Sequence, residues 1–207
     1  MHLIFDFDGT LVDSFNCVME KSLLLADEFN FRKLDLEEIQ SLRDLTSKEI
    51  IKYLQIPMYK IPKLIYQIRK YLHSEMRELN PIPEIPEVLE KLSNAGFTMG
   101  ILTSNSAENV RIWLNEHELQ HFFDFTHIES CYFSKKYVLK KTLKSYRSDK
   151  SKVLYIGDET RDIDAATQNN ISAIAVTWGY NSEKALLQYN PAHIARKPDD
   201  ILTICGL

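Results

Sequence analysis

The feature that most constrains the fold is an alternation of short apolar segments with amphipathic helical segments, which runs from residue 81 to the C-terminus. Apolar segments typical of strands cover residues 97–103, 125–128, 153–157 and 172–177. Helical patterns lie between and after them, at residues 86–95, 108–118, 136–145 and 161–168 and in short stretches toward the end. Such an alternation is typical of a parallel sheet that helices cover on both faces. With one more apolar strand in residues 1–13, the sequence predicts an α/β fold built on a doubly wound, Rossmann-like parallel sheet.

Residues 14–80 interrupt this alternation with helical patterns alone. Apolar side chains recur there every three or four residues, as on the buried face of an amphipathic helix. Residues 46–49, Thr-Ser-Lys-Glu, have the form of a capping box, which indicates a helix that begins at that point. We count three or four helices and no strand in this stretch. The predicted architecture is therefore an α/β core of residues 1–13 and 81–207 with an inserted helical cap of residues 14–80, which the proline-containing segment 80–86 joins back to the core.

Composition and charge exclude several classes of protein. The 207 residues are 44% hydrophobic and 26% charged and include 6 Gly and 7 Pro, which is typical of a globular chain rather than a disordered or repetitive one. The net charge is −4, from 25 basic and 29 acidic residues, and basic residues occur in runs no longer than two. A nucleic-acid partner is therefore not expected.

The expected compartment follows from features that the sequence lacks. Acidic residues within the first eight positions do not fit a signal peptide, and no apolar run approaches the length of a membrane span. Cys17, Cys131 and Cys205 are widely spaced and odd in number, which favours neither a disulfide framework nor a zinc site. We expect a cytoplasmic protein without a membrane partner, and the sequence does not indicate an oligomeric state.

Two groups of acidic residues follow predicted strands. Asp6 and Asp8 stand two residues apart after the first strand and are followed by Gly9 and Thr10, which offer a tight turn and a hydroxyl. Asp158 directly follows the strand 153–157, and Asp162 comes four residues later. Carboxylates held together in a partly desolvated site repel unless a cation or a shared proton offsets their charge, and Mg²⁺ is the obvious hard cation. Ordinary loop acids and helix N-terminal acids are the alternatives for each group alone.

Candidate phosphate ligands come from two further segments. The strand 97–103 ends in Thr103, Ser104 and Asn105, whose hydroxyl and N–H groups are donors of the kind that a phosphate uses, although such residues also cap helices. Lys135 or Lys136 could balance the charge of acids and a phosphate, although lysines on a helix are usually solvated. Because parallel strands bind ligands at their carboxyl ends, we expect these residues and the acids to meet at one edge of the sheet.

Taken in order, the motif DxDGTLxDS, the Ser-Asn strand end, the lysine and the motif GDxxxD resemble those of the haloacid dehalogenase superfamily of phosphatases. The resemblance covers essentially the whole chain and is closest to the phosphoglycolate phosphatase-like branch with a small helical cap. It implies that Asp6 is a nucleophile that forms an aspartyl-phosphate, and that Asp8 is the acid and base. It also implies that Asp6, Asp8 and Asp158 bind Mg²⁺, Asp8 through its main-chain carbonyl, with Thr10 and Asp162 in support.

The same resemblance implies roles for the remaining candidates. Ser104 and the backbone of Asn105 bind phosphate, with Thr103 as the alternative hydroxyl. Lys135 neutralises the nucleophile and the phosphoryl oxygens, with Lys136 as the alternative. We also propose Arg43 as a possible contact between the cap and the substrate, against the alternative of a solvated arginine.

The function that these inferences predict is Mg²⁺-dependent hydrolysis of a small phosphorylated metabolite, a phosphomonoester. A dehalogenase is disfavoured because it has no need of the second acid, Asp8. A signalling receiver domain is disfavoured by the DxDGT motif and by the large insertion after the first strand. A phosphomutase or another phosphotransferase of the same superfamily, or a non-enzymatic phosphate-binding protein, remains the alternative. The sequence does not identify the substrate.

Overall fold

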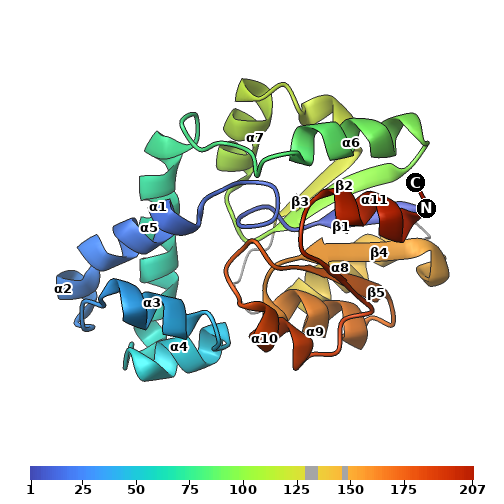
Figure 1. Ribbon diagram of the computed structural model, residues 1–207. Coiled ribbons are helices and arrows are strands. Elements are labelled where there is room, and N and C mark those ends of the chain that lie inside the picture. The colour runs from blue at the N-terminus through green and yellow to red at the C-terminus, as the bar shows by residue number, and fades with distance from the viewer. Residues whose placement is uncertain (129–134, 146–148) are drawn as a thin grey trace.

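The computed structural model describes residues 1–128, 135–145 and 149–207. Six strands of this described part form one sheet in which every neighbouring pair is parallel, in the order β3-β2-β1-β4-β5-β6 (Figure 1). The strands are β1 His2–Phe5, β2 Thr98–Thr103, β3 Phe125–Ile128, β4 Val153–Gly157, β5 Ser172–Val176 and β6 His193–Ala195. The prediction of a doubly wound parallel sheet is therefore confirmed. Cys131 lies outside the described residues.

Helices cover both faces of the sheet, because successive strand residues point to opposite faces. On one face, Leu3 and Phe5 of β1 pack in a cluster with α6 Ile85–Asn94, α7 Ala107–Glu116 and α11 Asp199–Cys205. On the other face, Ile4 packs in a cluster with α8 Lys135–Ser145, α9 Thr160–Gln168 and α10 Glu183–Leu187. In Figure 1, α6 and α7 lie above the strands, and α9 and α10 lie below them.

The edge strand β6, His193–Ala195, corrects the sequence analysis, which expected only short helices in this region. The strand has three residues and pairs with β5 alone. So short a segment contains no apolar alternation to recognise. It adds a strand at the side of the sheet and does not change the carboxyl ends of β1, β2 and β4, where the candidate site lies.

Residues 14–80, which we call the inserted helices, contain five α-helices and one short 3₁₀ helix rather than three or four helices. They are α1 Phe15–Leu24, α2 Ala26–Phe29, α3 Leu36–Leu42, α4 Ser47–Tyr53, the 3₁₀ helix η1 Met58–Lys60 and α5 Ile61–Glu75. The count differs because α2 is a single turn that follows α1 after one residue. The capping box predicted at residues 46–49 is present at the start of α4.

The inserted helices have an apolar cluster of their own, and they are tied to the core at two places. Leu25, Phe29 and Ile61 belong to that separate cluster, whereas Leu72 and Met76 near the end of α5 join the cluster of the α6 face. The outgoing and returning chains also pair with each other. Asp13 N–H donates to Asn80 O at 3.0 Å, and Ile82 N–H donates to Leu11 O at 2.8 Å. The helices thus stand to one side of the sheet on a paired connection (Figure 1).

Register brings the ends of three strands to the same edge. Phe5, the last residue of β1, is level with Ile101 of β2 and Ile156 of β4. The residues that follow β1, β2 and β4 therefore emerge side by side. These are the segments that begin at Asp6, Ser104 and Asp158.

Candidate active site

Asp6 and Asp158 occupy the centre of this edge, and both are buried. Asp6 Oδ1 accepts a hydrogen bond from Phe7 N–H at 2.8 Å, and Asp6 Oδ2 accepts one from Lys135 Nζ at 2.7 Å. Asp158 Oδ1 accepts from Thr10 Oγ1 at 2.6 Å, and Oδ2 accepts from Tyr180 N–H at 2.7 Å. Each carboxylate is therefore fixed by neighbouring donors before any ligand binds.

Lys135 is the cation of this cluster. Its side chain is 3% exposed, and its ammonium contacts Asp162 as well as Asp6. Burial acts to lower the pKa of Lys135, but the charges of Asp162 and Asp6 hold that pKa well above its ordinary value, so the side chain is a permanent cation. Lys136, the alternative in the sequence analysis, instead lies half-buried with Nζ 4.8 Å from the centre of the Tyr137 ring.

Three buried carboxylates form a group that suits a divalent cation. Ligand atoms of Asp6, Asp158 and Asp162 all lie within 4.8 Å of one another. Burial, followed by the charge of Asp6, raises the pKa of Asp158 well above its ordinary value. Burial also raises the pKa of Asp162 to about 7, with the charge of Lys135 opposing the shift. One lysine does not balance three acids, and carboxylate oxygens are the donors that a hard cation such as Mg²⁺ prefers, so the residues fit the metal.

Two glycines allow the loops to close around Asp158. A Cβ on Gly9 or on Gly179 would overlap Asp158 Oδ2, so no other residue fits at either position without a shift of the carboxylate. Gly9 also has a φ of +77°, in the region that favours glycine. Gly9 was predicted from the sequence motif, whereas Gly179 and Tyr180 were not. Their contribution depends on the loop after β5 folding back over β4, and the Trp-Gly-Tyr segment gives no local signal of this.

Asp8 lies beside the acid group rather than in it. Asn105 Nδ2 donates to the two carboxylate oxygens of Asp8 at 3.3 and 3.0 Å. The amide of Asn105 is oriented in turn, because its Oδ1 accepts from Asn109 Nδ2 at 2.9 Å and from Ser106 N–H at 2.7 Å. Burial and the charge of Asp6 raise the pKa of Asp8 to about 6, while the Asn105 hydrogen bonds oppose the shift.

Ser104 and Thr103 take different positions at the end of β2. Ser104 is partly exposed and lines the cavity described below, and its Oγ accepts from Arg161 Nη2 at 3.2 Å. Thr103 is buried, and its Oγ1 accepts from Asn105 N–H at 3.0 Å. Arg161 also pairs with Glu159, at 2.7 Å between Nη2 and Oε1. Arg161 was not among the predicted site residues, although it stands between the acids of the GDxxxD motif.

Arg43 holds the inserted helices to the core. Its Nη2 donates to Gly179 O at 2.7 Å and its Nε donates to Tyr180 O at 3.2 Å. Its guanidinium also lies 5.3 Å from the centre of the Phe15 ring. Arg43 is thus a docking residue for the loop that supports Asp158. It lines the cavity as well, so a contact with the substrate stays a prediction.

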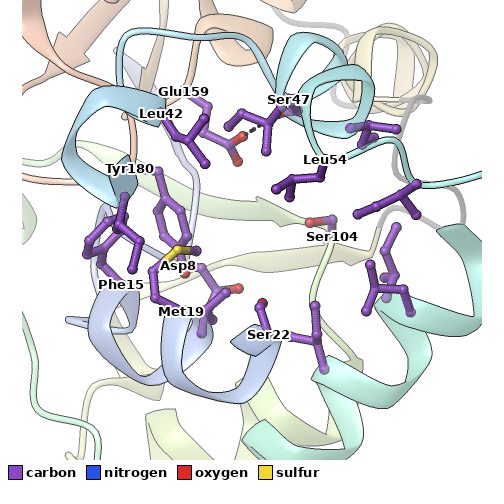
Figure 2. A pocket seen from close by; sticks show the side chains of 18 of the residues that line it. Asp8, Phe15, Met19, Ser22, Leu42, Ser47, Leu54, Ser104, Glu159 and Tyr180 are labelled. Atoms are coloured by element: carbon purple, nitrogen blue, oxygen red, sulfur yellow. Dashed lines mark hydrogen bonds between the residues drawn. The ribbon is translucent and has the colours of Figure 1, made fainter. Parts of the chain in front are cut away.

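A cavity of about 270 Å³ opens from this site into the inserted helices. Asp8, Ser104, Glu159 and Tyr180 of the core border it, and Phe15, Met19, Leu42 and Leu54 are among the side chains of residues 14–80 that line the rest (Figure 2). A hydrogen bond of 3.1 Å from Ser47 Oγ to Glu159 Oε2 joins the two sides. The fold and the site together define an α/β enzyme whose acidic centre meets a cavity under an inserted helical segment.

Comparisons with known proteins narrow this class to a family. Residues 3–176 match the haloacid dehalogenase-like hydrolases, and the chain belongs to that family. It is 30% identical, over 97% of its length and 94% of the relative, to a phosphoglycolate phosphatase of Synechococcus elongatus. It is 25% identical, over 98% of its length and 95% of the relative, to pyrophosphatase PpaX of Bacillus mycoides. The prediction of a phosphatase of this superfamily is therefore confirmed.

Solved structures agree with this assignment. A haloacid dehalogenase-like hydrolase from Streptococcus pneumoniae superposes with a TM-score of 0.81 at 25% identity, over 99% of this chain and 97% of that one.

Over residues 1–128, 135–145 and 149–207, none of the helices is both long enough and apolar enough to cross a membrane.

Proposed function

We propose that the protein is a cytoplasmic, Mg²⁺-dependent phosphatase that hydrolyses a small phosphomonoester through a phosphorylated Asp6. The observation that carries the proposal is the environment of Asp6, which is buried beside Asp158 and Asp162 and bonded to the ammonium of Lys135. A buried carboxylate that is oriented by an ammonium is suited to act as a nucleophile. The relatives named as phosphatases support a small phosphorylated molecule as the substrate.

The reaction proceeds in two displacements at phosphorus. In the first, an Asp6 oxygen attacks phosphorus, the bond from phosphorus to the ester oxygen breaks, and the leaving alcohol takes a proton from Asp8. In the second, Asp8 takes a proton from water, the water oxygen attacks phosphorus, and the bond from phosphorus to Asp6 breaks to release phosphate. Asn105 supports this double role because it holds both oxygens of Asp8 in place.

Several groups bind the charge of the phosphoryl group. The ammonium of Lys135 and the hydroxyl of Ser104 bind the phosphoryl oxygens, and Asn105 N–H joins them by leaving Thr103 Oγ1, to which it donates at 3.0 Å. Arg161 orients Ser104 through their 3.2 Å hydrogen bond. Thr103 is the less favoured hydroxyl, since its Oγ1 is buried against Asn105 N–H.

The metal site uses the acids at the ends of β1 and β4. The carboxylates of Asp6 and Asp158 and the main-chain carbonyl of Asp8 would hold Mg²⁺, with Thr10 and Asp162 in support. When bound, the ion neutralises charge so that a phosphate dianion can approach the Asp6 carboxylate. Thr10 keeps Asp158 oriented through its 2.6 Å hydrogen bond, and Lys135 holds Asp162 in place.

We also propose that the inserted helices, residues 14–80, act as a cap that excludes water from the phosphorylated enzyme. Their contact with the core supports this role, because Arg43 and Ser47 reach the two loops that border Asp158. A water-excluding cap limits loss of a reactive intermediate to side reactions.

The test is phosphate release from a panel of small phosphomonoesters with Mg²⁺, for the wild-type protein and for Asp6→Asn. The amide has the shape of the carboxylate but is a poor nucleophile, so Asp6→Asn should lose turnover and keep its fold. Asp164→Asn changes an exposed aspartate on α9 and is the matched control. Mass spectrometry of the acid-quenched wild type should place the phosphoryl group on Asp6. Phosphate on another residue, or full activity after EDTA treatment, would contradict the mechanism or the metal assignment respectively.

A further inference from the structure

The cavity beside Asp8 has two chemically distinct sides. Seventeen of the 28 described residues that line it are apolar, and all seventeen come from residues 15–72 of the inserted helices. The core contributes only polar lining side chains, among them Asp8, Ser104 and Arg161. Figure 2 shows Leu42 and Leu54 of the inserted helices around the same space as Asp8 and Ser104 of the core. A molecule bound here would place its polar end at the core and its body among hydrocarbon side chains.

Several apolar side chains of this wall are not packed away in the protein interior. Phe15, Met19 and Leu23 of α1 are only partly buried, although the inserted helices have a hydrophobic cluster of their own. Side chains left in this state gain stabilisation when an apolar group covers them. These apolar side chains would therefore stabilise a bound ligand that covers them with an apolar group.

The arginines that line the cavity also bear on the chemistry of its occupant. Arg43 donates to carbonyl groups of the core, and Arg161 pairs with Glu159 and Ser104 at the phosphoryl end. Arg69 of α5 is the third lining arginine. Apolar residues surround the rest of the space, and placing a charge among them without a full set of partners is costly.

We propose that the leaving group of the preferred substrate is apolar, so that the enzyme hydrolyses the phosphate ester of a hydrocarbon alcohol in preference to a compound whose leaving group is itself charged. This inference rests on the function proposed above and names its substrate class. The cavity size sets an upper limit. An apolar cavity of about 150 Å³ holds benzene, so about 270 Å³ accommodates roughly ten carbon atoms. The phosphoryl end takes part of this space, which leaves room for a chain of about six to eight carbons.

The experiment compares kcat/KM for methyl, n-butyl and n-hexyl phosphate, with Mg²⁺, against phosphoglycolate and pyrophosphate. Each buried methylene should raise kcat/KM about fourfold until the cavity is full. Hexyl phosphate should therefore exceed methyl phosphate by more than 100-fold and should also exceed phosphoglycolate. Equal values along the alkyl series, or a preference for phosphoglycolate or pyrophosphate, would overturn the inference while leaving the phosphatase proposal intact.

Binding separates this inference from the proposed function. Calorimetry with n-hexylphosphonate and methylphosphonate measures the affinity of the cavity for an alkyl chain in the absence of turnover. A folded protein that hydrolyses none of the esters but binds the hexyl compound more than tenfold tighter would retain the apolar site and refute the phosphatase proposal. Equal binding of the two phosphonates would refute the apolar site.

Ser22 gives a variant that fills the cavity without touching the acidic centre. It lines the cavity from α1 (Figure 2). Leu24, which is 63% exposed on the same helix, offers a matched control. Ser22→Phe should lower kcat/KM for hexyl phosphate at least tenfold and change that for methyl phosphate less than twofold. Leu24→Phe should change neither. Leu54→Phe is the second variant if Ser22→Phe fails to fold, and an unchanged chain-length preference in a folded variant would contradict the proposal.

Discussion

Replacing Lys135 by methionine tests the electrostatic account of the site through stability rather than through activity. The methionine keeps the length and apolar stem of the side chain but removes the charge that contacts Asp6 and Asp162. All three side chains are at most 3% exposed, so water cannot replace the missing ammonium. Removing one partner of a buried ion pair costs about 3–5 kcal/mol, because the remaining charge stays buried.

The expected change is large enough to measure by thermal or urea unfolding. For a chain of this size, each kcal/mol lowers Tm by about 2–4 °C, so Lys135→Met should lower Tm by about 6–20 °C in the absence of divalent ions. Mg²⁺ should restore more stability to this variant than to the wild type, because the acids it leaves unbalanced are those proposed to bind the metal.

Two controls make the result specific. Lys136→Met removes the neighbouring charge, which lies outside the acid group, and should change the free energy of unfolding by less than about 0.5 kcal/mol. Adding Asp162→Asn to Lys135→Met removes one uncompensated carboxylate, so the double variant should be more stable than the sum of the two single effects predicts. A Lys135→Met protein with the urea midpoint of the wild type would refute the charge balance described here.

Three further predictions concern the residues that position the acids. Gly179→Ala should raise the Mg²⁺ concentration that gives half-maximal activity about 10- to 100-fold, because its Cβ would overlap Asp158 Oδ2. A titration of activity against Mg²⁺ measures this midpoint, and an unchanged midpoint would contradict the prediction. Arg43→Ala should lower kcat/KM for all esters by a similar factor, because it removes hydrogen bonds to the loop carbonyls of Gly179 and Tyr180; an effect on one substrate alone would instead indicate a substrate contact. Thr10→Val should lower the affinity for Mg²⁺, whereas Thr10→Ser should keep the affinity of the wild type, because the hydroxyl donates a hydrogen bond to Asp158. A Thr10→Ser protein with the weak affinity of Thr10→Val would show that the methyl group matters instead.

The sequence predicts the centre of the sheet well because β1, β2 and β4 are buried on both faces. The segment 153–157 is uniformly apolar, lies at the centre of the sheet and coincides with β4. The three-residue strand β6 at the sheet edge is missed because it is too short to show a pattern. Helix count in the inserted region is also underestimated, since α1 and the single-turn α2 read as one continuous helix from sequence.

Prediction of the site is limited by contacts between distant loops. Asp6 and Asp158 are recognisable because they directly follow strands whose ends must meet. Gly179 and Tyr180 are not, because their contact with Asp158 depends on how the loop after β5 crosses the sheet edge. The amide of Asn105 is a similar case, since its contact with Asp8 depends on a side-chain orientation that a sequence motif does not contain.

The paired connection between residues 11–13 and 80–82 places the two ends of the 67-residue insertion next to each other. A hairpin-like entry of this kind means that the insertion can be exchanged for another segment, or shortened to a turn, without changing the strand order of the sheet. Closing a chain between ends that are already adjacent depends only weakly on the length of the segment. The acidic centre and the cavity wall are therefore separable parts of the gene product, and substrate range can change by substitution or replacement within residues 14–80 while the residues that act on phosphorus stay as they are.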